Sequence, residues 1–136
     1  MIEYSTERKI SIDQFISVLE RSTLAERRPV DDRDCIAQML ENADLLVTAW
    51  DDDLLVGVAR SVTDYGYCCY LSDLAVDVSY QKSGIGKALI RHTQELLGPK
   101  STLILLSTPA AMEYYSRIGF EHHPGAWILK PNKPLG

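Results

Sequence analysis

The chain has 136 residues, of which 46% are hydrophobic and 24% are charged. A chain of this length can bury about two thirds of its unfolded surface without disulfides or metals, and its composition excludes disordered, collagen-like and coiled-coil proteins. Its 14 Lys and Arg against 19 Asp and Glu give a net charge of −5 without a long basic run, so no nucleic-acid partner is expected. We therefore expect a single soluble domain over residues 1–136.

The cysteines and the N-terminus bear on the cellular compartment. Cys35, Cys68 and Cys69 form no CxxC pair, and an odd number of cysteines is not a disulfide framework. The N-terminus has no apolar stretch of signal length, and no segment approaches the roughly eighteen continuous apolar residues of a membrane span. The histidines show no metal-ligand spacing. The sequence therefore predicts a cytoplasmic protein with no membrane partner and no metal site.

The first half of the chain predicts two helices between a short strand and a β-hairpin. Ser11 followed by Gln14 three positions later is a capping box, which begins the first helix. Two apolar, β-branched runs separated by three aspartates indicate the hairpin. In chain order we expect a strand at residues 2–5, a helix from Ser11, a loop at 23–30, a helix capped by Asp31 or Asp32, and strands at 45–50 and 54–62.

The second half alternates strands and helices. Pro109 after Thr108 is typical of a helix start, and Gly119 of a helix end. The expected elements are a strand at 69–78, a helix from Gly84 to Gly98, a strand at 103–106 covered on both faces, a helix from Thr108 to Gly119, one or two strands from Phe120 through residues 127–129, and a flexible tail at 131–136. Together they predict an α/β domain with a mixed, mostly antiparallel central sheet flanked by helices.

A segment with two glycines lies between the strand at 69–78 and the helix that follows it. Its residues are Gln81, Lys82, Ser83, Gly84, Ile85, Gly86 and Lys87. The first N–H groups of a helix lack internal partners, and the peptide dipoles favour an anion there by about 0.3–1 kcal/mol. Glycines at 84 and 86 allow the backbone to approach a ligand, and Lys82 and Lys87 add positive charge. This layout predicts a phosphate site.

Two common phosphate loops do not fit this segment. A Walker A loop needs Gly where Gln81 stands and Ser or Thr where Ala88 stands. A dinucleotide fingerprint needs a small residue at Leu89. An ordinary tight turn between a strand and a helix is the alternative that holds no ligand.

Two stretches resemble the GCN5-related N-acetyltransferase family. Residues 74–89 contain Q-x-x-G-x-G after a strand and resemble the family's motif A, and residues 111–120 resemble its A-x-x-x-Y-x-x-x-G-F helix. With the element order, the resemblance covers nearly the whole chain. It implies acetyl-CoA as the cofactor, bound by the backbone of Leu74, Ala75 and Val76 and by Gln81, Lys82, Ser83, Gly84, Ile85, Gly86 and Lys87.

The resemblance also implies direct transfer of the acetyl group to a primary amine. Tyr115 matches the family's proton-donating tyrosine beside the cofactor, and an aromatic side chain packed under the sheet is the alternative. Tyr114 points about 100° away around the helix, so both tyrosines cannot serve. Thr108 stands where many members have an Asn that holds the pantetheine arm, and a helix N-cap is the structural alternative.

The base is less clearly marked. Ser72-Asp73 resembles the acidic pair of glucosamine-6-phosphate acetyltransferases, with the first acid lost. Asp73 is therefore a candidate base or partner of the substrate amine, and a strand-end carboxylate paired with backbone is the equal alternative. Arg27 and Arg28 are expected to be an exposed, solvated pair, and a contact with a carboxylate or phosphate on the acceptor is the other option.

We expect the acceptor to be a small-molecule amine. The alternatives are a non-catalytic module that binds acyl-CoA as a sensor, and an acetyltransferase of protein N-termini or lysines. A homodimer is left open, because the last strands of such proteins often pair between subunits.

Overall fold

The computed structural model describes residues 1–136, which form two compact units, residues 1–106 and 107–136. The strands of the first unit are β1 (Ile2–Ser5), β2 (Leu45–Asp51), β3 (Leu54–Thr63), β4 (Cys68–Val76) and β5 (Thr102–Ile104). They form one sheet in the order β1-β2-β3-β4-β5, in which β1 to β4 are antiparallel and β5 is parallel to β4. The expected mixed, mostly antiparallel sheet is confirmed.

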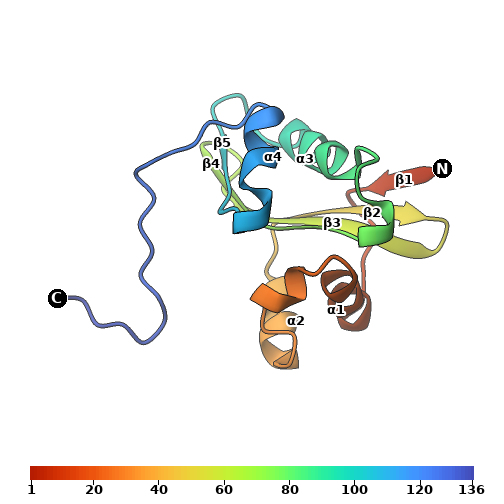
Figure 1. The fold of residues 1–136 in the computed structure, drawn as a ribbon, viewed down its shortest axis with the longest axis horizontal. Coiled ribbons are helices and arrows are strands. Elements are labelled where there is room, and N and C mark those ends of the chain that lie inside the picture. Colours follow the sequence, from red (N-terminus) through yellow and green to blue (C-terminus); the bar gives the residue numbers. More distant parts are fainter. The chain divides into compact units, whose positions relative to one another are not determined.

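Helices cover both faces of this sheet. As Figure 1 shows, α1 (Ile12–Arg21) and α2 (Arg33–Glu41) lie on one face and α3 (Ile85–Glu95) on the other. The predicted capping box begins α1, since Ser11 Oγ accepts the Gln14 N–H at 3.0 Å and Gln14 Oε1 accepts the Ser11 N–H at 2.9 Å. Of the two candidate caps of α2, Asp32 accepts the Cys35 N–H at 3.1 Å. No helix in the chain is long and apolar enough to cross a bilayer.

The main core lies between α1, α2 and the sheet. Its side chains come from the apolar stripes of the two helices and from strand residues that face them. They are Phe15, Val18, Leu19, Ile36, Trp50, Leu55, Val58 and Ala75. On the opposite face α3 packs against β3 at Gly57, where an added Cβ would lie 3.1 Å from Leu89 Cδ1. A glycine within a strand permits such a close approach, so it fixes the position of α3.

β3 and β4 pair with one irregularity. Arg60 lies opposite Asp73 and Ser61 opposite Leu71, so Ser72 has no partner and forms a β-bulge. A one-residue shift moves the side chains that follow it to the other face of a sheet. Leu71 therefore faces α3, whereas Asp73 faces α1 and α2.

The parallel ladder between β4 and β5 is short. It ends at Tyr70 and Ile104 after three residue pairs. From residue 71 to residue 76, β4 has β3 as its only neighbouring strand. The first unit thus leaves one backbone edge of β4 open, beginning at the bulge.

Several element boundaries differ from the sequence predictions. The strand predicted at 69–78 ends at Val76, because Asp77 begins a 3₁₀ turn, η2 (Val78–Tyr80), and accepts the Ser79 N–H. The loop predicted at 23–30 contains another 3₁₀ turn, η1 (Leu24–Arg27). The strand predicted at 103–106 is β5, whose first and last residues are exposed, so the prediction that it is covered on both faces is wrong.

The second unit contains a 3₁₀ turn, η3 (Pro109–Ala111), and helix α4 (Met112–Arg117). Gly119 ends this helix as predicted, with a φ of 107°. The strands predicted from Phe120 through residues 127–129 are wrong, since this segment contains no strand. Its one proline, Pro124, cannot donate to a ladder, and no neighbouring strand pairs with the segment. The single domain over 1–136 and the flexible tail at 131–136 stay predictions.

Candidate functional site

The N-terminus of α3 is an exposed set of backbone donors. Gly84 is its N-cap residue, and no side chain caps the helix. The Ala88 N–H bonds to the Gly84 carbonyl at 3.0 Å, so the three N–H groups before it have no acceptor within the helix. Residues 81–84 are exposed. This end of the helix can therefore bind an anion through its backbone.

Two residues of the glycine segment adopt the left-handed conformation. Lys82 has a φ of 66° and Gly84 a φ of 86°. For a residue with a side chain this conformation costs about 1–2 kcal/mol, which glycine avoids. A Cβ on Gly84 would meet no atom within 4 Å, so the glycine is required for its backbone conformation and not for space.

Side chains within the segment hold it in place. Gln81 Nε2 donates to the Val76 carbonyl at 3.0 Å, and Ser83 Oγ donates to the Tyr80 carbonyl at 2.5 Å. The Tyr80 hydroxyl donates to Asp51 Oδ2 at 2.6 Å, and this hydrogen bond raises the pKa of Tyr80. The segment is thus anchored to the end of β4 and to β2.

Asp77 is the first residue after β4, and it joins the segment between β4 and α3 to α1. Its Oδ2 accepts from Arg21 NH1 at 2.5 Å and its Oδ1 from the Ser79 N–H at 2.8 Å. Burial alone would raise the pKa of Asp77, but the bonds from Ser79 and Arg21 outweigh burial and lower it. Arg21 also donates to the Leu55 carbonyl at 2.7 Å. The charged pair therefore ties α1, β3 and the segment before α3 together.

The predicted strand residues lie beside the glycine segment. Leu74, Ala75 and Val76 are on the part of β4 whose outer edge is open, and Ala75 is buried in the core. Val76 is joined to Gln81 by the hydrogen bond described above. The structure thus places an open strand edge and an uncapped helix N-terminus at the two ends of one short connection, residues 77–84.

Asp73 is buried between two arginines. Its Oδ1 accepts from Arg28 Nε and its Oδ2 from Arg60 Nε, both at 2.5 Å. Arg28 NH2 donates to the Ser72 carbonyl at 2.8 Å. The prediction that Arg28 is solvated is wrong, whereas Arg27 is exposed as predicted. Asp73 is paired with side chains and not with backbone, and neither of its oxygens lacks a donor.

Tyr115 belongs to the second unit and packs on the turn that ends α4. The Phe120 N–H bonds to the Tyr115 carbonyl at 3.0 Å, and the two rings meet edge to face with centroids 5.4 Å apart. This is the arrangement of a Schellman motif. Burial, with a smaller contribution from Tyr114, raises the pKa of Tyr115. The phenol therefore keeps its proton at neutral pH.

Thr108 occupies the N-cap position of η3, but its side chain makes no capping hydrogen bond. Its backbone is extended, with a φ of −67° and a ψ of 153°. A capping hydrogen bond therefore does not explain why threonine stands at this position.

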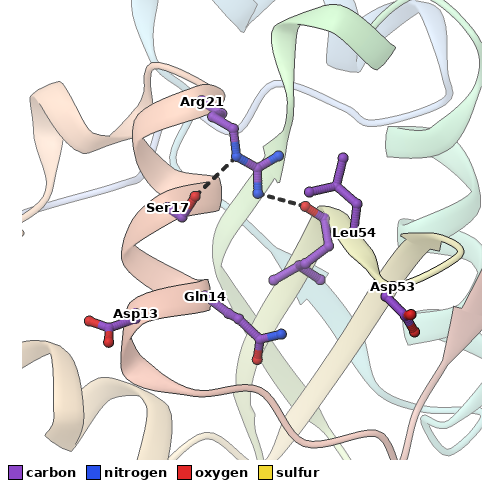
Figure 2. A pocket seen from close by; sticks show the side chains of 7 residues that line it. Asp13, Gln14, Ser17, Arg21, Asp53 and Leu54 are labelled. Carbon is purple, nitrogen blue, oxygen red and sulfur yellow. Dashed lines mark hydrogen bonds between the residues drawn. The ribbon is translucent and has the colours of Figure 1, made fainter.

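A shallow hollow of about 250 Å³ lies between α1 and the turn from β2 to β3. Figure 2 shows Arg21 beside it, bonded to Ser17 and to the adjoining strand. Its lining residues are Asp13, Gln14, Ser17, Arg21, Asp53, Leu54 and Leu55. None of the predicted site residues contributes to it.

Three residues that position this site were not predicted from the sequence. Gly57 and Arg60 interrupt an apolar strand, and such interruptions signal a close backbone approach and a paired buried charge. The pairing of Arg28 with Asp73 spans 45 residues, and no local pattern indicates it.

Comparison with known proteins identifies relatives of this arrangement. The model of the acetyltransferase (GNAT) domain matches residues 14–128. A protein of Glycine max named a histone acetyltransferase is 33% identical over 72 residues, which are 52% of this chain and 31% of that protein. The chain thus spans less than a third of the length of the first curated relatives it matches.

Solved structures share the fold over nearly the whole chain. A protein of unknown function from Staphylococcus aureus, named a probable acetyltransferase, has a TM-score of 0.78 at 21% identity, covering 96% of this chain and 99% of that one. An aminoglycoside N-acetyltransferase in complex with CoA has a TM-score of 0.74 at 16% identity, covering 98% and 96%. At these identities the likeness shows the fold alone.

Proposed function

The chain belongs to the GNAT acetyltransferase family, and on that premise we propose that it transfers an acetyl group from acetyl-CoA to a primary amine of a small molecule. One observation carries the proposal: the open edge of β4 at residues 74–76 leads directly to the uncapped N-terminus of α3. An extended thioester arm ending in a pyrophosphate needs an edge for the arm and a set of N–H donors for the phosphates.

The glycine segment fits a pyrophosphate. The first N–H groups of α3 have no other acceptor, and Lys82 and Lys87 supply positive charge at exposed positions. The side chains of Gln81 and Ser83 are bonded to backbone carbonyls, so in the proposal they shape the loop while backbone groups bind the phosphates.

Acetyl-CoA supplies an acyl group on a thioester sulfur that leaves as a thiol. An acceptor amine like that of lysine has a pKa of about 10.4, so its neutral form costs roughly 4–5 kcal/mol near pH 7. A base or a chain of waters must take that proton. In the proposal the amine attacks directly within a ternary complex, and backbone N–H groups of residues 74–76 stabilise the charge that develops on the carbonyl oxygen.

Tyr115 is the proposed proton donor to the departing sulfur. It stands four residues before Gly119, as the family pattern requires, and its raised pKa keeps the phenol protonated. Thr108 enters the proposal as a further contact of the pantetheine arm, because its side chain is not used as a cap.

Acetylation of a protein lysine or N-terminus is the second candidate function. A relative with 33% identity over 72 residues is named a histone acetyltransferase, which favours a protein acceptor for that relative. A non-catalytic sensor of acyl-CoA is the third, and the proposed donor Tyr115 argues against it.

A thiol-release assay with acetyl-CoA separates these candidates. The panel contains small amines, amino sugars and amino acids beside peptides with a free N-terminus or an internal lysine. We expect thiol release with a small amine, and Tyr115→Phe should suppress it. Release only with peptides would support a protein acceptor. Binding of CoA without release on any amine would support the sensor.

The cytoplasmic location and the homodimer also stay proposals. Light scattering of the purified chain gives its mass in solution, and a mass of two chains would support the dimer. Fractionation of cells that express the native protein tests the location.

A further inference from the structure

Two arginine side chains hold the bulge in β4. Each of them forms hydrogen bonds with both Ser72 and Asp73. Arg28 Nε donates to Asp73 Oδ1 and its NH2 to the Ser72 carbonyl. Arg60 Nε donates to Asp73 Oδ2 and its NH2 to Ser72 Oγ at 3.1 Å. We call Arg28, Arg60 and Asp73 the bulge clamp. Its hydrogen bonds satisfy the Asp73 carboxylate and both the hydroxyl and the carbonyl of Ser72, the residue that has no partner in β3.

The two arginines come from different parts of the first unit. Arg60 lies on β3 directly opposite Asp73 and also donates to the Met39 carbonyl of α2 at 3.2 Å. Arg28 follows η1 in the connection between α1 and α2. The bulge clamp therefore fixes β4 to the sheet from one side and to the connecting segment from the other.

Burial makes the clamp a costly feature. Asp73 is fully buried, and the side chains of Arg60 and Arg28 are 7% and 22% exposed. Buried ion pairs are often no more stabilising than apolar residues of similar volume, so their best-attested use is to specify one geometry. Here the geometry specified is the register change at Ser72.

That register change immediately precedes the open edge of β4. The presence of the bulge decides which backbone groups of residues 74–76 are paired with β3 and which are free. Loss of the bulge would slip these residues by one position against β3 and so exchange the two sets.

We propose that Arg28, Arg60 and Asp73 are positioning residues, which hold the β4 bulge so that the free backbone groups of residues 74–76 face the acyl donor. In this assignment Asp73 orients the strand and is not the base that deprotonates the acceptor. The inference rests on the proposed function for its link to catalysis, but its structural part can be measured without turnover.

The test compares Arg28→Met with Arg27→Met, a matched change of the exposed neighbour that takes no part in the clamp. Calorimetric titration with CoA gives affinity and the number of binding-competent sites. Turnover is then expressed per competent site, so that a loss of folded protein does not count as a loss of rate. Hydrogen exchange of the backbone amides of residues 72–76 reports the strand itself.

For Arg28→Met we expect turnover per competent site to fall by about tenfold to a hundredfold, because a small misplacement of groups that contact the reacting atoms has effects of this size. CoA should still bind, since its pyrophosphate contacts lie on the glycine segment. Exchange at residues 72–76 should accelerate by about tenfold while β2 stays protected. Arg27→Met should match the wild type in each measurement.

Arg28→Lys provides a second variant if Arg28→Met does not fold. Lysine keeps the charge but cannot donate to Asp73 and Ser72 as a planar fork, so turnover per site and exchange should lie between those of wild type and Arg28→Met. Full wild-type values in Arg28→Lys would overturn the clamp as a geometric device.

Asp73→Asn separates positioning from base catalysis. If Asp73 positions the strand, the pH dependence of turnover keeps the shape of the wild type at a lower rate. If the variant loses an ionisation from this profile that Arg28→Met retains, Asp73 is the base and the inference is wrong.

A failure of the proposed function can be told apart from a failure of the clamp. If the wild type acetylates no amine, hydrogen exchange at residues 72–76, measured with and without CoA, tests the clamp without turnover. Protection by CoA in the wild type and its absence in Arg28→Met would support the clamp. Equal exchange in wild type, Arg28→Met and Arg27→Met would overturn it.

Discussion

Gly57 of β3 lies against Leu89 of α3 so closely that a Cβ atom on the glycine would come within 3.1 Å of Leu89 Cδ1. The same atom would lie 3.3 Å from Ile85 Cγ2, at the first residue of the helix. The proposed phosphate donors are the N–H groups of that first turn. The depth at which α3 packs on the sheet therefore sets the position of the donors.

Gly57→Val should push α3 away from the sheet. Overpacking of this kind destabilises a protein by about 1–3 kcal/mol, and CoA affinity should fall because the donors move with the helix. Urea unfolding and calorimetric titration with CoA measure the two effects. Gly66→Val is the control, since a Cβ there meets only one carbonyl oxygen at 3.9 Å. Equal effects at both positions would contradict the assignment.

Gly84→Ala should cost about 1–2 kcal/mol of stability through backbone conformation alone, because the site has space for a Cβ but not the φ for it. Relaxation of the turn would also misdirect the α3 donors and weaken CoA binding. Gly84→Asn should recover part of both losses, since asparagine tolerates the left-handed region better than other residues with a side chain. If Gly84→Ala bound CoA as tightly as the wild type, Gly84 would be excluded from the site.

Tyr115→Phe should lower turnover by about a hundredfold while CoA affinity changes little, because only the transferable proton is lost. Tyr114→Phe is the matched control and should leave turnover unchanged. The pKa of Tyr115 is raised above the ordinary tyrosine value of about 10, so the phenol stays protonated below that pH. Ionisation of Tyr115 should therefore cause no loss of rate there. Steady-state kinetics from about pH 6 to about pH 10 measures both the loss of turnover and its pH dependence.

Asp77→Asn should destabilise the protein at neutral pH by about 1.5–3 kcal/mol, the usual worth of hydrogen bonds to a charged group. The folded pKa of Asp77 lies below its unfolded value, so this stability is present above about pH 3.9 and is lost as the pH falls through the folded pKa. The difference between variant and wild type should thus shrink in acid. Urea unfolding at several pH values measures it, with exposed Asp31→Asn as the control.

Local patterns were sufficient for several features. The capping box of α1 uses two side chains three residues apart, and the helix start at Gly84 follows from the glycine segment itself. Such features depend on neighbours in sequence, so a single chain reveals them. The predicted strand at residues 2–5 also has the bounds of β1.

Features that depend on distant partners were not predictable. The bulge at Ser72 follows from the register against β3, and an alternating sequence is compatible with either face before and after it. Asp73 was predicted to meet backbone or substrate, and its actual partners lie 13 and 45 residues away. The final strands failed because a strand needs a neighbour, which residue patterns alone do not supply.

The open edge of β4 has a consequence for solubility. Unpaired strand edges invite pairing with strands of other molecules and hence aggregation, and a protein that keeps one open for a ligand must discourage such pairing. The edge from residue 71 to residue 76 is short, and the bulge at Ser72 increases its local twist, so a flat incoming strand cannot follow it. We therefore expect the irregularity beside the site to disfavour edge-to-edge pairing between copies of the chain as well.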